Sequence, residues 1–88
     1  MRIQGYIQAE PFEDSEMKSE KLATYGVDGI TINHDGKGLT RTIEFLQSGD
    51  ELVVPDFKTL MIDGDISKAH LMLVKLQSKN ITLTILNQ

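Results

Sequence analysis

The sequence predicts an α/β fold with a single small, open, mainly parallel sheet of about four strands, flanked by three helices. Short apolar runs typical of strands alternate along the chain with longer segments whose apolar residues have helical spacing. This alternation favours parallel strands joined by right-handed helical crossovers. The length of 88 residues leaves room for one hydrophobic core, so residues 1–88 are expected to form one domain.

The first half of the chain predicts two strands and two helices. Pro11 prevents the first strand from continuing, and Gly26 lies where a glycine commonly ends a helix. Leu39, Ile43 and Leu46 have the spacing of one apolar helix face. The expected elements are a strand over 1–9, a helix from Asp14 or Ser15 to Tyr25, a strand over 27–33 and a helix over 39–47.

The second half predicts two further strands around the third helix. Leu52–Val54 is a short apolar run, and we expect Pro55 to break it. Asp65 or Ser67 caps a helix that continues to about Gln77. A final strand is expected over 81–86, where apolar and threonine side chains alternate. The face of the helix expected in the core consists of Ile66, Ala69, Met72, Leu73 and Leu76.

Two apolar residues of this last helix project away from the expected core face. Leu71 and Val74 lie roughly opposite its apolar stripe. An apolar pair on an outer face indicates either a contact with another molecule or ordinary surface exposure, which is common for single residues. We therefore take Leu71 and Val74 as the candidate residues of a protein interface.

Composition excludes several classes of function. A formal net charge of −4 argues against autonomous nucleic-acid binding, which relies on lysine and arginine to neutralise phosphates. The absence of cysteine excludes disulfides, thiolate metal sites and a cysteine nucleophile. The apolar runs are far too short for a membrane span, and no signal-peptide pattern is present at the N-terminus. We therefore expect a cytoplasmic protein that does not bind membranes.

One group of carboxylates could support metal chemistry. Asp63 and Asp65 flank Gly64, and Glu10 follows the first strand, so the three carboxylates could bind Mg²⁺ with water and a phosphate substrate. Capping gives a simpler explanation, in which Asp63-Gly64 forms a turn and Asp65 is the N-cap of the next helix. Capping chemistry alone would produce this pattern, and we favour it over the metal site.

The chain resembles the N-terminal catalytic domain of the serine recombinases, the resolvase and invertase family. The resemblance covers essentially the whole chain and implies a flavodoxin-like topology. Four blocks carry it: Met1-Arg2-Ile3-Gln4-Gly5-Tyr6-Ile7, Gly26-Val27-Asp28-Gly29-Ile30, Phe45-Leu46-Gln47-Ser48-Gly49-Asp50-Glu51-Leu52-Val53-Val54 and Asn80-Ile81-Thr82-Leu83-Thr84.

The chain departs from this family at the residues that perform its chemistry. The family has Tyr-x-Arg-x-Ser after the first strand, whereas this chain has Gln8 at the arginine position and Glu10 at the position of the nucleophilic serine. Asn33 replaces the acidic residue expected after the second strand. The family motif Asp-Arg-Leu-x-Arg after the third strand is replaced by Lys58-Thr59-Leu60-Met61-Ile62, in which only the packing residue Leu60 is retained.

The resemblance and its departures imply a pseudoenzyme, an inactive resolvase-like domain that serves as a protein-binding or regulatory module. They also imply a link to DNA recombination and to a mobile genetic element, self-association or a protein partner, and no cofactor. We expect no counterpart of the family's DNA-binding domain in residues 1–88. The alternative is a small Mg²⁺-dependent phosphotransfer or nuclease domain that resembles a Toprim domain at Glu10, Asp63 and Asp65. That alternative requires a strand at Thr59 to Ile62, where the recombinase interpretation requires a loop.

Overall fold

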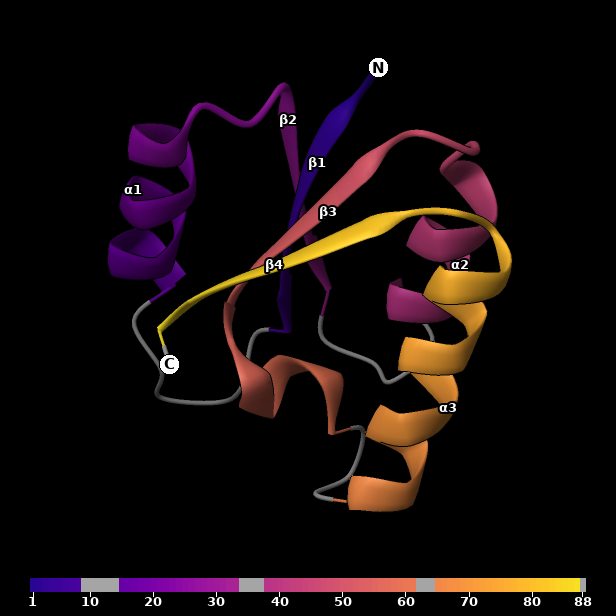
Figure 1. Ribbon diagram of the computed structural model, residues 1–88. Helices are drawn as coiled ribbons and strands as arrows, with labels where there is room; N and C mark the ends of the chain where they lie inside the picture. Colours follow the sequence, from indigo (N-terminus) through magenta and orange to yellow (C-terminus); the bar gives the residue numbers. More distant parts are fainter. Residues whose placement is uncertain (9–14, 34–37, 62–64, 88) are drawn as a thin grey trace.

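The computed structural model describes residues 1–8, 15–33, 38–61 and 65–87, which form one open sheet with helices on both faces (Figure 1). All four strands are parallel, in the order β2-β1-β3-β4. The predicted fold class is therefore confirmed. Within the described residues, no helix is long and apolar enough to cross a membrane.

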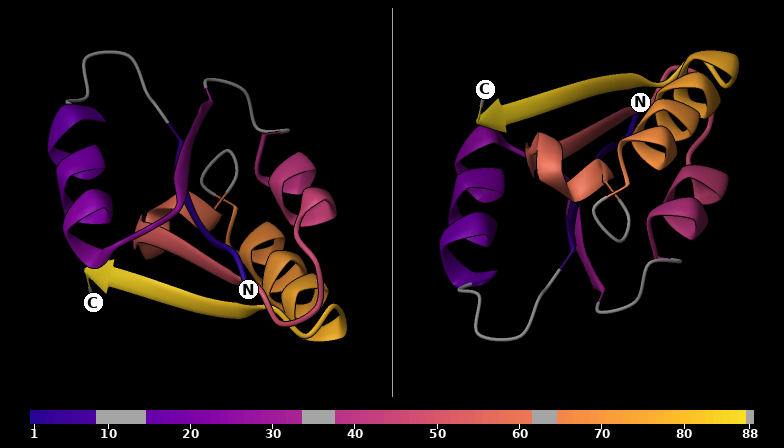
Figure 2. Two further views of the ribbon diagram at one scale, coloured as in Figure 1. Left: turned by 90° about the horizontal axis from the view of Figure 1, so that it is seen from above. Right: turned by 90° about the horizontal axis from the view of Figure 1, so that it is seen from below.

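The elements follow the predicted order closely. Helix α1 lies on one face of the sheet, whereas α2 and α3 lie on the other (Figure 2). The chain moves outward from β1 to β2, and then crosses back over β1 to β3, so the direction of winding changes between β1 and β3. The elements are β1 (Ile3–Gln8), α1 (Ser15–Tyr25), β2 (Gly29–Asn33), α2 (Gly38–Phe45), β3 (Glu51–Asp56), the 3₁₀ helix η1 (Phe57–Leu60), α3 (Ile66–Ser78) and β4 (Thr82–Asn87).

The sheet separates two apolar clusters of unequal size. Alternation along each strand sends successive side chains to opposite faces. The larger cluster lies between the sheet and the pair α2 and α3, and its buried members are Tyr6, Leu39, Ile43, Leu46, Leu52, Val54, Leu60, Ala69, Met72, Leu76 and Ile81. The smaller cluster is centred on Ile7, Leu22 and Val53 under α1. Burial of these residues supplies the main driving force for folding.

Two local predictions are wrong, because contacts with other elements determine where β3 ends and which residues of α3 are buried. Strand β3 does not end at Val54 but continues through Pro55 to Asp56. Beyond Val53, β3 no longer pairs with β1, and Pro55 has no partner in the register with β4, so no ladder hydrogen bond needs its missing N–H. Ile66, expected in the core, is 68% exposed because it is the first residue of α3 and extends past the buried stripe.

Two aspartates fix the beginning of β1 against neighbouring turns. The Asp28 carboxylate accepts a hydrogen bond from the backbone N–H of Ile3 at 2.7 Å. The Asp50 carboxylate accepts from the backbone N–H of Arg2 at 3.0 Å and from that of Gln47 at 2.8 Å. These bonds hold the pKa of Asp50 below its ordinary value, the bond from Gln47 having the largest effect. The carboxylate thus joins the turn before β3 to the first residues of the chain.

Candidate functional site

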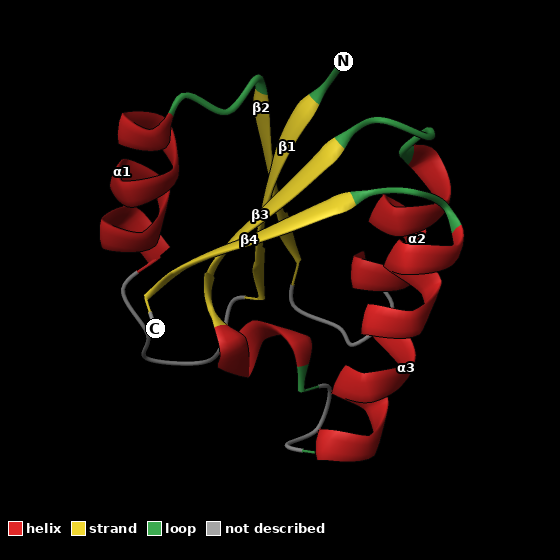
Figure 3. Ribbon diagram, in the orientation of Figure 1, coloured by secondary structure: helices red, strands yellow, loops and turns green. Residues whose placement is uncertain are grey.

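The predicted site lies at the carboxyl edge of the sheet, where all four parallel strands end. Ligands of open α/β sheets commonly bind at this edge, at the point where the direction of winding changes. Here that point lies between the ends of β1 and β3, and η1 follows β3 directly (Figure 3). Gln8 ends β1, Asn33 ends β2, and Lys58 and Thr59 lie in η1. The topology therefore brings these positions to one edge.

Gln8 occupies the position at which the resembled family has an arginine. Its side-chain oxygen accepts a hydrogen bond of 2.7 Å from the hydroxyl of Tyr6. The Tyr6 side chain is completely buried in the larger core cluster, so it provides a rigid donor. A neutral amide in this position brings no positive charge to the edge of the sheet.

Thr59 and Asp56 form the second described part of this edge. One carboxylate oxygen of Asp56 accepts hydrogen bonds from the backbone N–H and from the hydroxyl of Thr59, both at 3.0 Å. Thr59 is buried, and the neighbouring Leu60 is completely buried in the larger core cluster. This arrangement closes the turn from β3 into η1 and holds the Asp56 carboxylate beside Thr59. The expected packing role of Leu60 is confirmed.

The remaining predicted residues are described only in part. Glu10, Ile62 and Asp63 lie outside the described residues, and the description of Asn33 and Lys58 is limited to their backbone. Asp65 is the N-cap of α3, and its carboxylate accepts a hydrogen bond of 2.9 Å from the backbone N–H of Ser67. The predicted capping role of Asp65 is therefore confirmed.

Of the three carboxylates of the metal alternative, the structure describes only Asp65. They contain no group of three or more histidine, cysteine, aspartate or glutamate side chains that could hold a metal ion. Thr59 and Leu60 belong to a 3₁₀ helix and Met61 to a bend, so this part of the segment lacks the strand that the Toprim-like alternative requires.

The outer face of α3 carries the predicted interface pair. Leu71 is 56% and Val74 45% exposed, as their spacing predicts. Val74 also borders a groove of about 260 Å³ between α2 and α3. At one end of this groove the Lys79 ammonium donates hydrogen bonds to the carbonyl oxygens of Ile43 and Glu44, at 2.8 and 3.1 Å. Lys79 therefore fixes α2 against the end of α3 and gives the groove a rigid wall.

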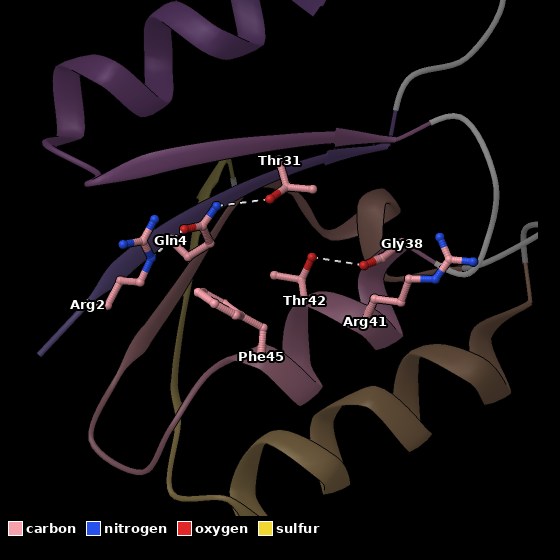
Figure 4. Close-up of a pocket in the computed structure, with 7 residues that line it drawn as sticks. All are labelled: Arg2, Gln4, Thr31, Gly38, Arg41, Thr42 and Phe45. Carbon is pink, nitrogen blue, oxygen red and sulfur yellow. Dashed lines mark hydrogen bonds between the residues drawn. The ribbon is translucent and has the colours of Figure 1, made fainter.

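A second hollow, which the sequence did not predict, lies between the first two strands and α2. It has a volume of about 360 Å³. Figure 4 shows Arg2 and Arg41 at opposite ends, with the side chains of the strands facing those of the helix. The lining residues are Arg2, Gln4, Thr31, Gly38, Arg41, Thr42 and Phe45, and we call this hollow the β2–α2 pocket.

The floor of the β2–α2 pocket is a buried hydrogen-bonded amide. The Gln4 side chain is 5% exposed, and its oxygen accepts a hydrogen bond of 2.8 Å from Nε of Arg2. Its nitrogen donates to the hydroxyl oxygen of Thr31 at 3.0 Å. The only sequence signal was a glutamine near the start of a strand whose central residues are buried. Its neighbours depend on the strand order and register, which pair Gln4 with Gly29 and Tyr6 with Thr31.

Comparison with known proteins adds no family assignment. No protein-family model matches the chain, and no curated protein matches it.

Proposed function

We propose that the protein is a catalytically inactive resolvase-like domain that acts as a protein-binding or regulatory module. The observation that carries the proposal is the chemistry of the carboxyl edge between β1 and β3. Its described side chains are the neutral Gln8 and Thr59 and the carboxylate of Asp56, which accepts both hydrogen bonds from Thr59. In the resembled family this edge carries the nucleophilic serine and the arginine cluster.

Strand exchange by that family requires a hydroxyl nucleophile and cations that stabilise the transferring phosphoryl group. The carboxylate at the family's serine position, Glu10, cannot form a phosphoserine linkage to DNA. The Asp56 carboxylate adds electrostatic repulsion toward a DNA phosphate at the same edge. Both features oppose recombination, and the net charge of −4 opposes DNA binding.

The α3 face that contains Leu71 and Val74 is the proposed contact surface. Two exposed apolar side chains one turn apart, next to the α2–α3 groove, can bury area against a second copy of the chain or a recombinase-type partner. The resemblance supports a cytoplasmic role linked to DNA recombination and to a mobile genetic element. We favour the resolvase-like module over the Mg²⁺-dependent alternative because Thr59 to Met61 form a 3₁₀ helix and a bend, where that alternative requires a strand.

Sedimentation equilibrium over a wide range of protein concentration tests the contact surface. We expect reversible self-association that the double variant Leu71→Ser/Val74→Ser abolishes. Ile66→Ser is the matched control, because Ile66 is an exposed apolar residue of the same helix and its replacement should leave association unchanged. A wild-type protein that stays monomeric and binds no co-expressed recombinase would contradict the proposal.

The absence of catalysis is tested separately on supercoiled DNA that carries paired recombination sites. We expect neither inversion nor cleavage, and no covalent adduct between protein and DNA after denaturation. Detection of such an adduct would show that the carboxyl edge retains a nucleophile, and the pseudoenzyme proposal would then fail.

A further inference from the structure

We propose that the β2–α2 pocket binds a small organic oxyanion, a molecule that carries a phosphate or carboxylate group. The pocket lies on the face of the sheet that α2 and α3 cover, and it includes none of the residues at the carboxyl edge discussed above. The inference is therefore independent of the proposed function.

The distribution of charge is the first reason. The chain has 13 acidic residues and only two arginines, Arg2 and Arg41, yet both arginines line this one pocket. Within the described part of the chain no carboxylate lines the pocket, although Asp50 interacts electrostatically with Arg2 from outside the lining. A lining with two cations and no described carboxylate favours an anion as the ligand.

The direction of the hydrogen bonds is the second reason. An arginine Nε can only donate, so the oxygen of the Gln4 amide must face Arg2 and its nitrogen must face Thr31. The Thr31 hydroxyl oxygen therefore accepts, and its own proton is available for a ligand in the pocket. The floor of the pocket thus offers one hydroxyl donor, that of Thr31, which can bond to an oxygen atom of an anion.

The fixed position of Arg2 is the third reason. The buried Gln4 holds Nε at 2.8 Å, and the guanidinium Cζ lies 5.5 Å from the centroid of the Phe45 ring. Stacking and hydrogen bonding together restrict the side chain, so less entropy is lost when a ligand binds. Its two terminal nitrogens make no hydrogen bond to any residue that the structure describes, and they can contact an oxyanion.

The volume limits the ligand to a small molecule. About 360 Å³ lies near the lower end of the range, about 300 to 1,000 Å³, that small-molecule pockets occupy. The exposed ring of Phe45 provides an apolar wall for the carbon skeleton of such a ligand. In Figure 4 the Arg41 guanidinium points away from Gln4 and Thr31, so direct contacts to an anion in the pocket come from Arg2 and Thr31.

Titration of the ¹⁵N-labelled protein with pyrophosphate, and separately with succinate, at constant ionic strength tests the proposal. We expect saturable chemical-shift changes at Arg2, Gln4 and Thr31 with at least one probe. If pyrophosphate binds more tightly, the pocket prefers a phosphate group, and if succinate does, it prefers a carboxylate. Shifts that do not saturate with either probe would overturn the proposal. Tighter binding of a single-stranded oligothymidylate than of both probes would also overturn it.

Variants distinguish binding in the pocket from nonspecific electrostatic attraction of anions. We expect Arg2→Gln to weaken binding of the tighter probe about tenfold or more and Thr31→Val to weaken it several-fold. Lys21→Gln removes the same charge from an exposed position on α1, across the sheet, and should leave affinity unchanged. Equal weakening by Arg2→Gln and Lys21→Gln would show adventitious ion binding only, and would overturn the proposal.

Gly29→Ala provides a test that keeps the charge and changes the geometry. A Cβ atom on Gly29 would lie 2.9 Å from a terminal nitrogen of Arg2 and 3.4 Å from the side-chain oxygen of Gln4, so the end of the Arg2 side chain must leave its observed position while the fold is retained. We expect the affinity of this variant for the tighter-binding probe to be at least several-fold lower than that of the wild type. The midpoint of thermal unfolding should be unchanged. Wild-type affinity in Gly29→Ala would contradict a site built on the observed position of Arg2.

Discussion

Replacement of Leu60 by alanine tests whether η1 is anchored in the core. The Leu60 side chain is completely buried in the larger cluster, although it belongs to a one-turn helix that follows β3. Loss of a buried leucine side chain costs about 3 kcal/mol, because transfer and cavity terms add. A domain of 88 residues has a total stability of roughly 4 to 13 kcal/mol. The substitution should therefore remove between about a quarter and three-quarters of the free energy of unfolding.

Urea denaturation followed by circular dichroism measures this loss. With a slope of about 1 kcal/mol per molar urea, the midpoint should fall by about 3 M, or the variant should be unfolded without urea. Leu71→Ala is the matched control, since the same atoms are removed from a side chain that is 56% exposed. Its stability should change by less than about 0.5 kcal/mol. Similar midpoints for the two variants would refute the assignment of Leu60 to the core.

Three further predictions concern single polar or backbone features. Asp56→Ala should lower the free energy of unfolding by about 1 to 3 kcal/mol, because it removes the acceptor of two hydrogen bonds from the buried Thr59. Thermal melts measure this loss, and Asp56→Asn, which keeps one side-chain oxygen as an acceptor, should lose less stability than Asp56→Ala. Hydrogen bonding from Gln47 lowers the pKa of Asp50 in the folded state, so this carboxylate stabilises the fold above its unfolded pKa, and the contribution is lost as the pH falls through the folded pKa. Asp50→Asn should consequently lose less stability than the wild type between neutral pH and about pH 3 in urea titrations, and an equal loss would contradict this. Gly49 has a φ of +93°, a conformation unfavourable for other residues, so Gly49→Ala should lower stability by about 1 to 2 kcal/mol in the same assay.

Much of the fold was predictable because local signals agree with the tertiary structure. Helical spacing predicted the buried Ala69, Met72 and Leu76, and capping chemistry predicted the role of Asp65. The proline rule failed at Pro55, because its effect depends on whether a neighbouring strand needs the missing N–H at that point. Secondary structure follows from short-range patterns, whereas strand pairing does not.

The candidate site was less predictable for the same reason. Gln8 and Thr59 were identified by alignment with a known motif, but their hydrogen bonds to Tyr6 and Asp56 required coordinates. The carboxyl edge itself followed from the parallel topology. The partners of each polar side chain depend on register, and a register shift of one residue would turn every side chain of a strand to the opposite face.

The sequence by itself determined the fold class and the order of the elements. Only the tertiary structure decided that Arg2 and Arg41, 39 positions apart, line the same pocket. That proximity depends on the strand order β2-β1-β3-β4 and on the packing of α2 over the first two strands. Such long-range pairing is selected by the burial of the whole apolar core, and no short segment of the chain specifies it.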